Sequence, residues 1–132
     1  MQLGRILMGA MYVAAGLAHF AFPHLYQSVV PDYLPAHHAL VMLSGVAEIA
    51  GGVGVTIPAT RRAAAWGLVL LLVAVCPANT WMVQHPERFP QFPFWSLCLR
   101  LPLQLLFIAW AWRYTRRPGG VQRSDAGGSE LP

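Results

Sequence analysis

Five polar side chains that interrupt long apolar runs are the residues of this sequence that could do chemistry. Glu48 and Arg100 are charged, His19 can take up a proton, and Asn79 and Gln104 carry amide groups. An ionisable side chain at the centre of a membrane helix costs about 2.5–3.5 kcal/mol, so such residues are functional candidates by default. Together these side chains are suited to hold a small polar headgroup or to transfer a proton.

Glu48 is the clearest candidate, because it lies about 13.5 Å inside its apolar run, near the centre of a bilayer. We expect it to point into a helix bundle, and we predict Arg100 as its partner, with Gln104 at the same depth. Small residues occupy the positions three and four residues away, where another helix can approach closely. These positions are Ser44, Gly45, Gly51 and Gly52.

The other two candidates extend this set to all four apolar runs. His19 lies about 4.5 Å from the end of the first run, with Tyr12 on the same helical face. Asn79 follows Pro77 in the third run. We predict one shared polar cluster that opens toward the outer side of the membrane. The alternatives are that the Glu48–Arg100 pair only fixes helix register, that His19 is hydrogen-bonded at the interface, and that Asn79 repairs the backbone gap left by Pro77.

The amino-acid composition indicates which kind of structural element must position these residues. Hydrophobic residues make up 56% of the 132 residues and charged residues only 11%, against roughly a quarter in soluble domains. Too few charges remain to coat a globule, which argues against a soluble enzyme. The net charge of +4 comes from arginines that stand between apolar runs, with no lysine. This pattern is typical of membrane topology and not of a nucleic-acid partner.

Four apolar runs are long enough to cross a membrane, and none alternates with period two. They cover residues 4–22, 39–57, 63–83 and 95–114, so we predict an all-α, four-helix transmembrane bundle over residues 1–115. The prolines of the connections 23–38 and 84–94 predict that both are non-helical. Residues 116–132 lack an apolar face and are expected to form a disordered cytoplasmic tail.

The arginines predict the orientation of the bundle. Seven lie on the side of the termini and of the turn 56–62, whereas the opposite connections contain only Arg88, so we expect both termini in the cytoplasm. These seven are Arg5, Arg61, Arg62, Arg113, Arg116, Arg117 and Arg123. The first run could instead be a signal peptide, but cleavage after it would move one arginine group to the wrong side.

The sequence does not contain the residues that several familiar redox chemistries require. There is no Cys-x-x-Cys, and His19 is the only histidine inside a predicted span, so a dithiol shuttle and a bis-histidine haem are not expected. No metal site and no self-sufficient catalytic motif are recognised. Cys76 and Cys98 could approach each other on adjacent helices, with simple apolar packing as the alternative.

Six segments, in order across all four runs, give the chain a resemblance to small bacterial DoxX-family membrane proteins. The resemblance covers about residues 4–114 and implies a four-helix integral membrane protein of the bacterial inner membrane. The family's polar motif positions fall on His19, Glu48, Asn79, Arg100 and Gln104. The segments are AAGLAHF (14–20), PDYLP (31–35), SGVAEIAGG (44–52), RRAAAWGL (61–68), CPANTWM (76–82) and LRLPLQ (99–104).

Relatives in that family include subunits associated with thiosulfate:quinone oxidoreductase and other membrane redox complexes. We therefore expect an accessory or quinone-linked component of a membrane redox assembly, with lipid and redox subunits as partners. In this hypothesis Arg100, Gln104 and His19 hold a quinone-like headgroup while Glu48 exchanges a proton. The alternatives are a non-enzymatic assembly chaperone or scaffold that contacts a partner membrane protein, and a small proton-coupled transporter.

Overall fold

The computed structural model describes residues 2–117, and within this range it contains helices and no strand. Four segments are long and apolar enough to cross a membrane, as predicted. The first, second and fourth are α1 (Gln2–Ala21), α3 (His37–Thr56) and α6 (Phe94–Thr115). The third, Arg61–Gln84, is divided into α4 (Arg61–Ala74) and α5 (Cys76–Gln84). The chain is thus a multi-pass helical membrane protein, and most of the expected tail lies outside the described residues.

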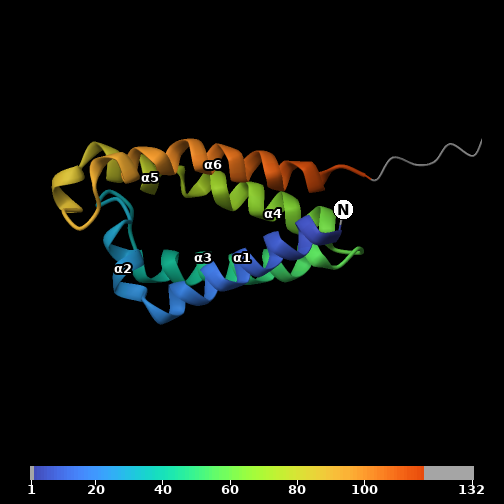
Figure 1. The fold of residues 1–132 in the computed structure, drawn as a ribbon. Helices are drawn as coiled ribbons and strands as arrows, with labels where there is room; N and C mark the ends of the chain where they lie inside the picture. The colour runs from blue at the N-terminus through green and yellow to red at the C-terminus, as the bar shows by residue number, and fades with distance from the viewer. Residues whose placement is uncertain (1, 118–132) are drawn as a thin grey trace, which may run out of the picture.

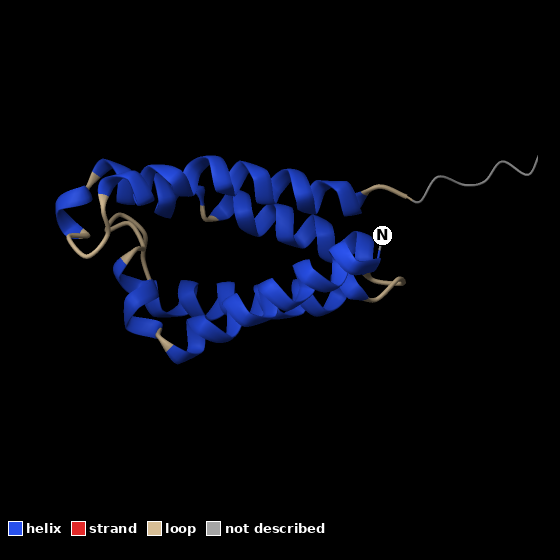
Figure 2. Ribbon diagram, in the orientation of Figure 1, coloured by secondary structure: helices blue, strands red, loops and turns tan. Residues whose placement is uncertain are grey.

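The helices form two layers (Figure 1). Helix α1 packs along α3, and on the other side α4 and α5 pack along α6, while the contact of α3 with α4 joins the layers. We call the end that carries the start of α1, the turn 57–60 and the end of α6 the turn end. The opposite end, with the connections 29–36 and 85–93, is the loop end. The ribbons of the two layers lie close at the turn end and farther apart toward the loop end (Figure 2).

Two hydrophobic clusters hold these ends. The larger one draws on all four spans and includes Met8, Val55, Leu68 and Ala111, all of which are fully buried. The smaller one joins α5, the following connection and α6 through Met82, Phe89 and Leu97. Large apolar side chains elsewhere on the spans, such as Leu3, Leu43, Leu70 and Leu105, are more than half exposed. Lipid is the solvent that such a surface requires.

Glycines set the short distance between α1 and α3. A Cβ atom on Gly52 would lie 2.8 Å from the carbonyl oxygen of Gly9. A Cβ atom on Gly16 would lie 2.6 Å from the carbonyl oxygen of Gly45. The expected close approach of another helix to the small-residue face around Glu48 is therefore confirmed, and α1 is that helix.

The two proline-rich connections are only partly non-helical, which corrects the sequence prediction. Residues Pro23–Ser28 form the short helix α2, and Pro86–Arg88 form the 3-10 helix η1. Both elements begin with proline, whose fixed φ suits the first helical position and whose missing N–H is not needed there. Helix α2 packs on α3, which places its side chains beside the polar residues of the α1–α3 layer.

Candidate functional site

Glu48 pairs with His19 and not with Arg100, so the predicted partner is wrong. The Glu48 Oε2 atom lies 2.7 Å from His19 Nδ1, and the two side chains are only 17% and 12% exposed. The physical reason is the glycine contact: α1 lies so close to α3 that a Cβ atom on Gly45 would be 2.9 Å from the Cβ of His19. Arg100 belongs to the other layer.

The His19–Glu48 contact is close but not a well-directed hydrogen bond. Both atoms are buried, and neither makes a hydrogen bond of good geometry with any residue in the range 2–117. The hydroxyl of Tyr12 is likewise buried without a partner among these residues. When the imidazole is protonated, charge attraction holds the pair in a region of low dielectric constant.

Tyr26 of α2 covers this pair from the loop end. Its ring centroid lies 3.9 Å from that of His19, with the planes tilted by 52°. Burial raises the pKa of Tyr26 above its usual value of 10.0, the Glu48 carboxylate raises it further, and the Arg100 guanidinium opposes both. The charges of both Glu48 and Arg100, which the sequence predicted to pair with each other, therefore act on Tyr26. The sequence prediction missed this residue because it treated 23–38 as non-helical; proline at a helix start was the available signal.

The amides of Asn79 and Gln104 form a second polar group, in the other layer. Asn79 Nδ2 donates to Gln104 Oε1 over 2.8 Å, and Gln104 Nε2 donates to the carbonyl oxygen of Leu72. That carbonyl lies in the last turn of α4, where the helix breaks before Pro77 and carbonyls lose their regular partners. Gln104, which is 4% exposed, thus donates to a carbonyl beside the break, and Asn79 orients Gln104. The expectation that Asn79 itself repairs the gap is corrected.

An open cavity of about 430 Å³ lies beside this amide pair, between α4, α5 and α6. The Arg100 guanidinium carbon lies 5.3 Å from the ring centroid of Phe92, in a cation–π contact at the cavity wall. Within residues 2–117 Arg100 has no carboxylate within 4.0 Å. The polar lining residues are Asn79, Ser96, Arg100 and Gln104, and the apolar ones are Leu72, Val75, Phe92, Leu103 and Phe107.

The expected single cluster is therefore divided into two groups. Asn79, Arg100 and Gln104 line one cavity, whereas His19 and Glu48 form a pair between α1 and α3. Each residue's depth along its helix follows from its position in the apolar run, but the direction in which its side chain points does not. Cys76 and Cys98 are free thiols in the α5–α6 region, and Cys76 donates to the Leu72 carbonyl over 3.5 Å.

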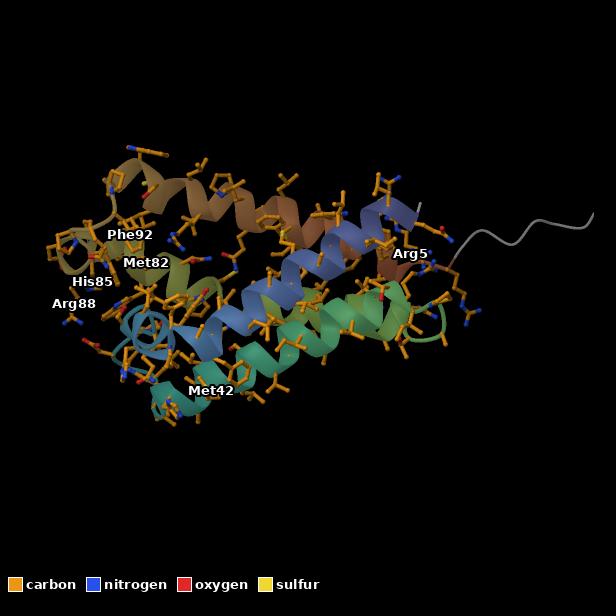
Figure 3. All side chains as sticks on the ribbon, turned by 60° about the horizontal axis from the view of Figure 1, so that its bottom comes forward. Arg5, Met42, Met82, His85, Arg88 and Phe92 are labelled. Atoms are coloured by element: carbon orange, nitrogen blue, oxygen red, sulfur yellow. The ribbon has the colours of Figure 1, made fainter. Side chains whose placement is uncertain are left out.

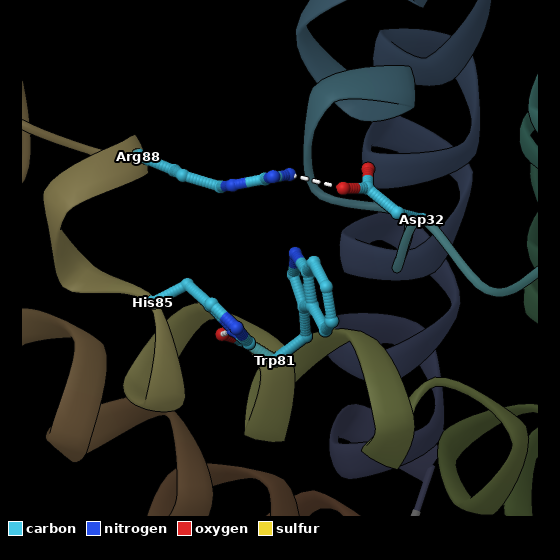
Figure 4. Close-up of polar contacts among 4 residues, drawn as sticks. All are labelled: Asp32, Trp81, His85 and Arg88. Atoms are coloured by element: carbon cyan, nitrogen blue, oxygen red, sulfur yellow. Dashed lines mark hydrogen bonds and ion pairs between the residues drawn. The ribbon is translucent and has the colours of Figure 1, made fainter.

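Aromatic and charged residues join the two layers at the loop end (Figure 4). Arg88 pairs with Asp32 of the opposite connection, and its guanidinium carbon lies 5.5 Å from the ring centroid of Trp81. His85 packs on the same indole at 3.9 Å, and Tyr33 meets it edge-on at 5.7 Å. About half of each charged side chain is exposed, so the ion pair alone contributes at most about 1 kcal/mol. The rings of Tyr33, Trp81 and His85 supply the rest of the contact.

The chain belongs to a family described as a domain of unknown function (DUF8561), which matches residues 8–115. The matched range contains the second, third and fourth spans, most of the first span, and every candidate residue named above. No curated protein and no solved structure matches the chain.

Proposed function

We propose that the cavity between α4, α5 and α6 binds the headgroup of a quinone-type membrane lipid. The protein then acts as an accessory, quinone-linked component of a membrane redox assembly, as its resemblance to the DoxX family implies. We place it in the bacterial inner membrane with both termini in the cytoplasm, following the arginine distribution.

Arg100 is the observation that carries this proposal. Its guanidinium has no carboxylate partner among residues 2–117, yet it lies in the wall of a cavity with five apolar lining residues inside a membrane span. A cation in such a place is costly unless a ligand or another group offsets the cost. A quinone carbonyl oxygen accepts hydrogen bonds from a guanidinium, which always donates.

The remaining lining residues also suit such a headgroup. Phe92 and Phe107 offer apolar surface for the flat ring. Gln104 is already engaged on both sides of its amide, by Asn79 and by Leu72. We therefore assign Gln104 a positioning role and leave Arg100 as the main donor to the ligand, which changes the sequence hypothesis. An apolar tail would continue along the lipid-facing side chains around the cavity.

His19 and Glu48 have a separate role in this proposal. Quinone reduction takes up two electrons and two protons; a redox subunit of the assembly supplies the electrons. The His19–Glu48 pair is an acid–base group at a 2.7 Å contact, and the charges of both Glu48 and Arg100 act on Tyr26. We propose that this pair exchanges the protons.

Binding of a short-tailed quinone to the purified protein tests this function. Arg100→Gln removes the cation, whereas Arg113→Gln removes a charge from the same helix at a position outside the cavity. A charge-assisted hydrogen bond contributes about 1.5–3 kcal/mol, so Arg100→Gln should weaken binding by roughly ten- to a hundredfold. Tryptophan quenching or calorimetry measures this. Equal affinity of Arg100→Gln and Arg113→Gln would contradict the proposal.

A further inference from the structure

A second cavity, of about 300 Å³, lies at the turn end of the bundle between the start of α1 and the end of α3. Its polar lining consists of Arg5, Gln2 and Thr56, and its apolar lining of Ile6 and Pro58. Figure 3 shows Arg5 at this end of the molecule, far from the labelled residues of the loop end. The candidate site described above does not use this cavity.

Positive charge gathers around this cavity, and no acidic residue of the range 2–117 lies beside it. Within residues 2–117 the acidic residues are Asp32, Glu48 and Glu87, and none of them lies at the turn end. Six arginines lie there, and no ion pair within the described range involves any of them. They are Arg5, Arg61, Arg62, Arg113, Arg116 and Arg117.

Two of these arginines already have a structural role. Arg62 Nε donates to the carbonyl oxygen of Thr115 over 3.0 Å, and Arg61 Nη2 donates to that of Arg116 over 3.4 Å. These bonds satisfy backbone oxygens at the end of α6. Arg5 makes no side-chain hydrogen bond within residues 2–117, although it is half-buried. It is the one arginine that lines the cavity.

The surface next to the cavity is apolar along both helices. Leu3, Ile6 and Leu7 share one face of α1 and are 69%, 56% and 54% exposed. Val53 and Ile57, near the end of α3, are 48% and 44% exposed. A cation at the membrane surface, a polar pocket and an apolar strip toward the membrane interior match the three parts of a phospholipid: phosphate, glycerol and acyl chain.

We propose that this cavity binds one anionic phospholipid, with its phosphate on Arg5 and an acyl chain along the exposed faces of α1 and α3. Basic pockets between membrane helices are suited to such headgroups. Guanidinium donates two parallel hydrogen bonds to phosphate, which adds specificity to the charge attraction. This site is independent of the quinone proposal, because none of its lining residues lines the other cavity.

Native mass spectrometry of the full chain tests the site with phosphatidylglycerol and phosphatidylcholine as probes. The wild type should retain one phosphatidylglycerol in preference to phosphatidylcholine. Arg5→Gln should reduce that preference about tenfold, and Arg113→Gln should leave it unchanged. Ile6→Trp, which fills the cavity and keeps Arg5, should reduce the preference at least as much as Arg5→Gln does. This second variant decides the matter if Arg5→Gln does not fold.

Three outcomes would overturn the proposal. The wild type could bind both lipids equally. Arg5→Gln and Arg113→Gln could lower the preference to the same extent, which would indicate diffuse surface charge and no site. Inorganic phosphate could displace the retained phosphatidylglycerol at millimolar concentration, which would indicate a pocket for free anions.

Discussion

Glu48 and Arg100, the two charged residues away from the ends of the spans, have different partners in the fold. Glu48 lies against His19 at 2.7 Å, and Arg100 lies over the ring of Phe92 at 5.3 Å. An ion pair between them would have neutralised both and left the cavity wall without a free cation. Because each has its own contact, the roles proposed for them, proton exchange and binding of a headgroup, belong to separate groups of residues.

The His19–Glu48 pair should be energetically coupled. Removing one partner leaves a buried charge or polar group without its neighbour, which destabilises proteins strongly, whereas removing both does so less. We expect His19→Gln and Glu48→Gln each to lower the free energy of unfolding. The double variant should lose less than the sum of the two, with a coupling of about 0.5–3 kcal/mol.

Denaturation of the four proteins in detergent measures this coupling. Glu87→Gln is the matched control, because Glu87 is exposed and its side chain makes no ion pair with a described residue. Strictly additive single effects would show that the 2.7 Å contact contributes nothing.

Tyr26 reports the charges on both sides of it. Its folded pKa lies above the unfolded value of 10.0 because burial and the Glu48 carboxylate favour the neutral phenol. The neutral form therefore stabilises the fold below about pH 10, and this contribution is lost as the pH rises through the folded pKa. Glu48→Gln should lower the Tyr26 pKa, and Arg100→Gln should raise it.

Ultraviolet titration of the phenolate band, with Tyr26→Phe to assign the signal among the four tyrosines, measures these shifts. If neither variant moves the Tyr26 signal, or if both move it in the same direction, Tyr26 does not lie between opposite charges.

At the scale of elements, the glycine contact of α1 with α3 should tolerate no added methyl group. A Cβ atom on Gly52 would lie 2.8 Å from the Gly9 carbonyl oxygen, which is backbone and cannot move aside. We expect Gly52→Ala to destabilise the fold by about 1–3 kcal/mol. Gly67 is the matched control, because a Cβ atom there meets nothing within 4 Å. Gly67→Ala should stabilise by up to about 1 kcal/mol through helix propensity.

Thermal unfolding of both variants measures the difference. Equal effects of the two substitutions would mean that α1 and α3 do not pack through their glycines.

The elements also show which features of the fold the sequence could predict. The spans were predicted to within three residues at each end, because apolar length is set by membrane thickness. Helix α2 was missed because proline has two meanings. Inside a helix it indicates a break, but at the first helical position, as in α2, it is favourable. The partner of Glu48 was missed for another reason: depth depends on residue number alone, whereas the side-chain direction depends on which helices pack together. For α1 and α3, the glycines on their facing surfaces were the signal that these two helices pack together.

The arginine distribution predicts the orientation of the whole bundle in the membrane. If the turn end faces the cytoplasm, Gln91→Cys at the loop end should react with a membrane-impermeant maleimide in intact cells. Ala59→Cys, in the turn 57–60, should react only after permeabilisation. Both residues are exposed, and both variants are made with Cys76 and Cys98 replaced by serine. The reverse labelling pattern would invert the topology and place the arginine-rich turn end outside.

The two ends of the molecule differ in their packing and in the cavities that they carry. The turn end carries the main hydrophobic cluster and the basic cavity proposed for an anionic lipid. Toward the loop end the layers separate, and there lie the cavity with Arg100 and the Asp32–Arg88 contact that joins the layers.

Photo-crosslinking tests whether a quinone headgroup binds in the cavity beside Arg100. A photoreactive quinone analogue is bound to the protein in its membrane, irradiated and located by mass spectrometry of peptides. We expect labels on the segment 92–107 and beside Asn79, suppressed by excess unlabelled quinone and reduced by Arg100→Gln. Labels spread over the lipid-facing residues of all four spans, or labels that unlabelled quinone does not suppress, would contradict the claim.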